Sequence, residues 1–109
     1  MVRHAATSAL ADDVRRELGR VTDRLRVLGP RWAQRENPPA ELDAVLAALQ
    51  HFADLAADGA GEPRRQVPAL RLHALADQLT VLGHDALVAA EASTLHAVRA
   101  TLLDLRRSL

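Results

Sequence analysis

The chain has 109 residues, which is enough for one domain with a modest hydrophobic core, and we expect a single domain over residues 1–109. Lys and Arg balance Asp and Glu at 14 each, and the formal net charge of zero argues against a nucleic acid or an anionic membrane as the main partner. Ala, Leu and Val supply most of the 49% apolar residues, which favours helices, and the absence of Cys excludes disulfides and thiolate chemistry.

The first predicted helix runs from about residue 8 to residue 28. Thr7 or Ser8 could cap its start, and Gly29-Pro30 is expected to stop it. Its heptad-spaced apolar seam consists of Ala11, Val14, Leu18, Val21, Leu25 and Leu28.

A row of arginines lies along the same helix, at Arg16, Arg20 and Arg24. One interpretation is that these side chains pair with acids nearby or on the second helix. The other is that they contact nucleic-acid phosphates, which the interleaved acids and the zero net charge disfavour.

The second predicted helix runs from about Pro39 to Asp58, after a loop that carries the single Trp, Trp32. A flexible linker follows at Gly59-Ala60-Gly61-Glu62-Pro63. The seam of this helix consists of Leu42, Val45, Leu49, Phe52 and Ala56.

The third helix is expected to begin at Pro68 and to end before Gly83, and the fourth to continue to the C-terminus. The third seam is Leu72, Leu75, Leu79 and Leu82. The fourth is Val88, Glu91, Leu95, Val98, Leu102, Leu105 and Leu109, of which one member is charged.

The two halves of the chain resemble each other, since the string D-x-L-x-V-L-G ends at Gly29 in one half and at Gly83 in the other. Each half is interpreted as helix, glycine stop, helix, and whether the halves arose by duplication stays open. The sequence thus predicts an all-α fold, an antiparallel four-helix bundle built from two similar αα-hairpins. In this arrangement the first and third connections share one end of the bundle.

A candidate binding site follows from that topology. Glu91 and His84 lie on the fourth seam, and Arg31, Trp32 and Arg35 lie in the first loop, so all five are expected at the same end. They could form a small-molecule or partner site. In the alternative interpretation, Trp32 is a core lid and Glu91 pairs with an Arg at a solvent-exposed end.

The sequence contains no recognised reaction centre. It lacks the Glu-x-x-His, His-x-x-x-His and phosphate-loop patterns, and no Cys, Tyr or Lys is available as a nucleophile. We therefore expect neither an enzyme nor a metal or cofactor site.

The most favoured function is protein–protein interaction or self-assembly as a homo-oligomer, and the alternative is a small-molecule-binding regulatory domain at the Trp32 and Glu91 end. The off-seam apolar residues that could serve a partner are Val27, Leu46, Val81, Leu87 and Leu103. No run of about 20 apolar residues is present, and all 14 basic residues are Arg, which is typical of a GC-rich genome, so we expect a bacterial protein of the cytoplasm.

Overall fold

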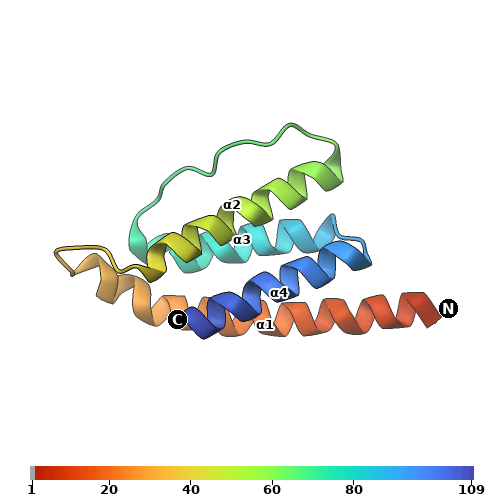
Figure 1. Cartoon of the computed structure of the whole chain (residues 1–109), viewed down its shortest axis with the longest axis horizontal. Coiled ribbons are helices and arrows are strands. Elements are labelled where there is room, and N and C mark those ends of the chain that lie inside the picture. The colour runs from red at the N-terminus through yellow and green to blue at the C-terminus, as the bar shows by residue number, and fades with distance from the viewer. Residues whose placement is uncertain (1) are drawn as a thin grey trace.

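The computed structural model describes residues 2–109, with side chains described from residue 7 onward. Over this range the chain is helical and contains no strand, which confirms the predicted all-α class (Figure 1). The elements are α1 (Val2–Ala33), α2 (Glu41–Ala60), the short 3-10 helix η1 (Leu72–Ala74), α3 (Leu75–Val88) and α4 (Ala92–Ser108). The α-helices pack as a four-helix bundle.

The order of helix directions is set by an extended segment, residues 61–71, which we call the crossover. It leaves the end of α2 and returns along the bundle, so that α3 starts near the end where α2 began (Figure 1). As a result α2 and α3 run parallel, and α1 and α4 run in the opposite direction.

The helices form two hairpins, hairpin one (α1 and α2) and hairpin two (α3 and α4). Each helix packs against both helices of the other hairpin. Within the described residues, the Cα atoms of α1 and α2 nowhere come within 8 Å of each other, and α3 meets α4 less extensively than it meets α1 or α2. The bundle therefore consists of two interlocked hairpins.

The expectation that the first and third connections share one end is wrong. Gly29, near the end of α1, lies against Leu72 at the start of hairpin two, and Gly59, near the end of α2, lies against Ala89 just after α3. The two connections are therefore at opposite ends. The physical reason is reach: the extended crossover spans about 3.3 Å per residue, enough to retrace a helix that rises 1.5 Å per residue.

The two glycines that were expected to stop helices lie inside helices instead. A Cβ on Gly29 would lie 2.6 Å from the carbonyl oxygen of Leu72, and a Cβ on Gly83 would lie 2.7 Å from Cδ1 of Leu18. Both glycines permit close approach of the hairpins. Position 29 corresponds to 83 and position 18 to 72, so the contact is reciprocal, which is the pattern of two-fold symmetry.

Helix α2 lies within two residues of its predicted bounds, but the starts of the other three helices differ more from the predictions. Helix α1 begins at Val2, so Thr7 and Ser8 lie within the helix. Hairpin two starts at Leu72 rather than at Pro68, because the crossover stays extended up to that point. Helix α4 starts only after Glu91, whose backbone is extended with φ −85° and ψ 173°.

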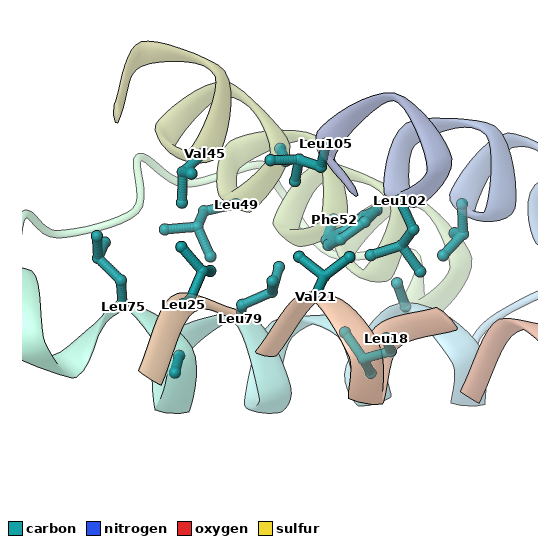
Figure 2. Packing of buried hydrophobic residues seen from close by; sticks show 14 of the residues in the cluster. Leu18, Val21, Leu25, Val45, Leu49, Phe52, Leu75, Leu79, Leu102 and Leu105 are labelled. Atoms are coloured by element: carbon teal, nitrogen blue, oxygen red, sulfur yellow. The ribbon is translucent and has the colours of Figure 1, made fainter. Parts of the chain in front are cut away.

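The hydrophobic core lies between the hairpins and is built from the predicted seams (Figure 2). Equivalent positions of the two halves agree in burial: Leu25 and Leu79 are both buried, as are Val45 and Val98. The buried seam residues are Val14, Leu18, Val21, Leu25, Val45, Leu49, Phe52, Leu75, Leu79, Leu95, Val98, Leu102 and Leu105. Burial of these side chains against the other hairpin supplies the main driving force for folding.

Candidate binding groove

The five residues of the predicted site are not brought together. Trp32 lies in the last turn of α1, beside exposed Arg31, and exposed Arg35 follows the helix. His84 lies on the exposed surface of α3, and Glu91 lies beyond the end of α3, at the other end of the bundle. The prediction of a pocket between Trp32 and Glu91 is therefore wrong. The crossover reverses the direction of hairpin two relative to the expected topology, so that the two residues lie at opposite ends of the bundle.

Trp32 and Glu91 also differ in their surroundings. Trp32 is only 6% exposed and belongs to the core cluster, which agrees with the alternative interpretation of Trp32 as a core residue. Glu91 is exposed and precedes the first turn of α4, where its carbonyl oxygen accepts a hydrogen bond from Leu95 N at 2.9 Å. It is therefore not a charged member of a buried seam.

The crossover is held to α2 and α3 by side-chain hydrogen bonds. The amide of Gln50 donates from Nε2 to the Arg65 carbonyl and accepts at Oε1 from Val67 N, both at 2.9 Å. This pair of bonds reproduces one rung of a β-ladder and keeps the segment extended. On the α3 side, Gln78 Nε2 donates to the Pro68 carbonyl at 2.9 Å.

A third attachment joins Arg64 of the crossover to the last turns of α2. Its guanidinium donates to both carboxylate oxygens of Asp58, at 3.0 and 2.7 Å, and lies 3.9 Å from Asp54. The hydrogen bonds from Arg64 lower the pKa of Asp58. Because the lowered pKa belongs to the folded state, this attachment is at full strength above the ordinary carboxyl pKa and is lost as the pH falls through the lowered value.

A groove, which we call the crossover groove, lies between α2, the crossover and α3. It contains two adjoining cavities of ≈ 550 Å³ and ≈ 650 Å³ that share Ala53, Arg65 and Leu82. Small residues on α2 leave this space open. The crossover does not fill the space either, since it is held by polar contacts and only Val67 among residues 61–71 is half-buried. The apolar lining is Ala53, Ala56, Ala57, Ala60, Pro63, Val67, Pro68, Leu70, Ala74, Val81, Leu82, Val88 and Ala89.

Three large apolar side chains of the groove face solvent: Leu70, Val81 and Val88 are 52%, 59% and 89% exposed. Contiguous exposed apolar surface in a groove is typical of a binding site. The sequence had marked Val81 as an off-seam residue, but it placed Val88 on a buried seam and gave no signal for Leu70.

The rim of the crossover groove is acidic. Glu62, Asp77 and Asp85 are exposed lining residues, and Arg65 is the one basic lining residue of the two cavities. Within residues 7–109, these three acids take part in no ion pair. The groove thus offers unneutralised negative charge beside an apolar floor.

A buried glutamate, Glu17, was missed by the sequence reasoning. It is 5% exposed between α1 and α4, with Arg20 donating to Oε2 at 2.9 Å. Arg106 Nε lies 2.9 Å from Oε1, close enough for an ion pair but outside hydrogen-bonding geometry. Because the two arginines neutralise it, Glu17 is best explained as a structural tie between α1 and α4.

Two of the three residues in the arginine row of α1 pair with nearby acids, as one of the two interpretations expected. Arg16 pairs with Asp13 and Arg20 with Glu17, each three residues earlier. Arg24 donates instead to the carbonyl oxygen of Leu109 at 3.2 Å, which joins the row to the end of α4.

Over the described part of the chain, no group of three His, Asp or Glu side chains is placed to hold a metal ion. None of the described helices is both long and apolar enough to cross a membrane. The chain matches no protein-family model, and it has no match among curated proteins or solved structures.

Proposed function

We propose that this chain is a non-enzymatic binding domain of the bacterial cytoplasm that acts by contact with another protein through the crossover groove. The observation that carries the proposal is the exposed apolar lining beside an acidic rim. The complementary partner is an apolar segment flanked by basic residues, such as an amphipathic helix with Lys or Arg on its polar face.

The shape of the site favours a segment over a small molecule. The two cavities adjoin along the groove, and exposed apolar residues border both of them. An elongated partner would cover Leu70 and Val88 together and remove both from water, and this burial would supply the affinity. The acidic rim would speed association and select the charge of the partner.

Small-molecule binding remains the second candidate, now at the crossover groove instead of the Trp32 end. A cavity of ≈ 550 Å³ is within the usual size range of ligand pockets, about 300–1,000 Å³. The ligand would be largely apolar, in keeping with the lining.

The direct test uses two dye-labelled synthetic helices that share a leucine face and differ only in carrying Lys or Glu on the other face. The Lys helix should bind more tightly, and Val81→Gln should weaken its binding about tenfold, which corresponds to about 1.4 kcal/mol. Val27→Gln is the matched control, because Val27 is the equivalent residue of hairpin one, is 47% exposed and lies outside the groove.

Charge is tested separately with Asp77→Asn and Asp85→Asn, which should weaken binding of the Lys helix at low salt and have less effect at high salt. Equal binding of the Lys and Glu helices, or equal effects of Val81→Gln and Val27→Gln, would contradict the proposal. If neither helix binds but an uncharged apolar compound raises the melting temperature, the small-molecule candidate is favoured.

A further inference from the structure

Neither hairpin buries its apolar stripe by itself. The Cα atoms of α1 and α2 are more than 8 Å apart throughout the described residues, and the core is formed by contacts between hairpin one and hairpin two. Leu25 of hairpin one and Leu79 of hairpin two lie in the same cluster (Figure 2). Folding of one hairpin therefore requires the other, whichever chain supplies it.

The contact between hairpins is reciprocal as well as extensive. Gly29 receives the backbone of Leu72, and Gly83 receives the side chain of Leu18. Each hairpin thus contributes one glycine and one leucine to the contact, and the leucine of each hairpin packs against the glycine of the other. Such a surface has the self-complementary character of an isologous dimer interface.

The crossover is the covalent link between the hairpins, and it adds little to their packing. Of residues 61–71 only Val67 is half-buried, and the others are exposed. Its attachments are hydrogen bonds that Val67 N donates to Gln50, that Arg64 donates to Asp58 and that Gln78 donates to the Pro68 carbonyl. Release of the crossover would leave the interface between the hairpins intact.

We infer that the closed monomer is in equilibrium with an intertwined dimer, in which two copies exchange hairpins and hairpin one of each copy packs against hairpin two of the other. When two bundles lie side by side and antiparallel, the end of α2 in one bundle is next to the start of α3 in the other. Each crossover can then connect the two bundles, and the dimer has two-fold symmetry. In this dimer the crossover joins the two bundles and no longer lies beside α2, so the crossover groove, which Arg65, Val67 and Leu70 help to line, exists only in the closed monomer. The inference rests on the packing of the hairpins, and its failure would leave the proposed function, which belongs to the closed monomer, untouched.

The test uses complementary lesions in the full-length chain. Leu25→Asp places a charge in hairpin one, and Leu79→Asp places it at the equivalent site of hairpin two; the native side chains are 1% and 0% exposed. Each variant alone should be unfolded by circular dichroism. When the two are mixed, one copy supplies an intact hairpin one and the other an intact hairpin two, so about half of the helical signal should return, in a species of two chains.

The matched control mixes Leu25→Asp with Val21→Asp, which both damage hairpin one and should stay unfolded together. Should a single lesion leave a variant folded, a second Asp at Val21 or Leu75 completes the damage within the same hairpin. A complementary mixture that stays as unfolded as its components would overturn the inference.

A second variant tests the role of the crossover length. Deletion of residues 64–69 leaves a link that reaches roughly 17 Å, shorter than the roughly 25 Å spanned by η1 and α3. The deleted chain, which cannot close on itself, should therefore be entirely dimeric by light scattering and still helical, whereas replacement of the same residues by an equal length of Gly and Ser should keep the closed monomer accessible. A folded monomer, or a chain that stays unfolded at high concentration, contradicts hairpin exchange.

Discussion

Three helical glycines of this chain differ in what a side chain would meet at their positions. Around Gly19 no atom outside the local helix backbone lies within 4 Å of the Cβ position, whereas at Gly29 the Leu72 carbonyl oxygen lies 2.6 Å away. That oxygen is backbone and can move only if η1 moves. At Gly83 the nearest atom is Cδ1 of Leu18, at 2.7 Å, which is the end of a side chain and can rotate.

The three positions therefore predict an ordered series of alanine variants. Gly19→Ala should raise the free energy of unfolding by about 0.5–1 kcal/mol, the gain in helix propensity. Gly29→Ala should lower it by about 1–3 kcal/mol through overpacking, and Gly83→Ala should fall between them. Urea unfolding followed by circular dichroism measures the series, and a Gly29→Ala variant as stable as the natural chain would show that the hairpins do not approach so closely.

At the scale of elements, the crossover is the segment whose conformation the neighbouring helices impose. Pro63 and Pro68 disfavour helix within it, and Gln50 binds its backbone on both sides of Gln66. The segment is thus kept extended by side chains of residues distant in the sequence, and α3 begins only where these contacts end.

The bond from Gln50 to the crossover gives a local prediction. Gln50→Ala should speed hydrogen exchange of the Val67 amide at least tenfold, because that N–H loses its acceptor at 2.9 Å. The free energy of global unfolding should fall by only about 1 kcal/mol. Gln78→Ala, which removes the bond to Pro68, is the control and should leave Val67 exchange nearly unchanged. Unaltered exchange at Val67 in Gln50→Ala would mean that another group holds the segment.

At the scale of the whole molecule, one core shared by two hairpins implies one unfolding event. Leu102 of hairpin two is fully buried, and Trp32 of hairpin one reports separately by fluorescence. Leu102→Ala should lower the free energy of unfolding by about 2–5 kcal/mol. The transition monitored by Trp32 and that monitored by circular dichroism should shift together, whereas the exposed Leu46→Ala should shift both only slightly. Separate midpoints for the two signals would show that the hairpins unfold independently.

The sequence predicted which residues are buried, but it did not reveal the role of the glycines. Val45, Leu49 and Phe52 were placed on a seam by their spacing, and all three are buried. Gly29 and Gly83 were interpreted as helix stops, because a glycine that ends a helix and a glycine that admits a neighbour look the same in sequence. Because Gly83 was taken as the end of the third helix, the fourth helix was predicted to begin too early. Glu91 was therefore assigned to the seam of α4, although α4 begins only after it.

The sequence by itself determined the helices, their buried faces and the likeness of the two hairpins, because heptad spacing is a local property that selects one face of a helix. The tertiary structure decided the direction of α3, the separation of Trp32 from Glu91 and the existence of the crossover groove. The physical reason is that the path of the crossover depends on bonds such as that between Gln50 and Val67, which are 17 residues apart. No local pattern specifies such a contact.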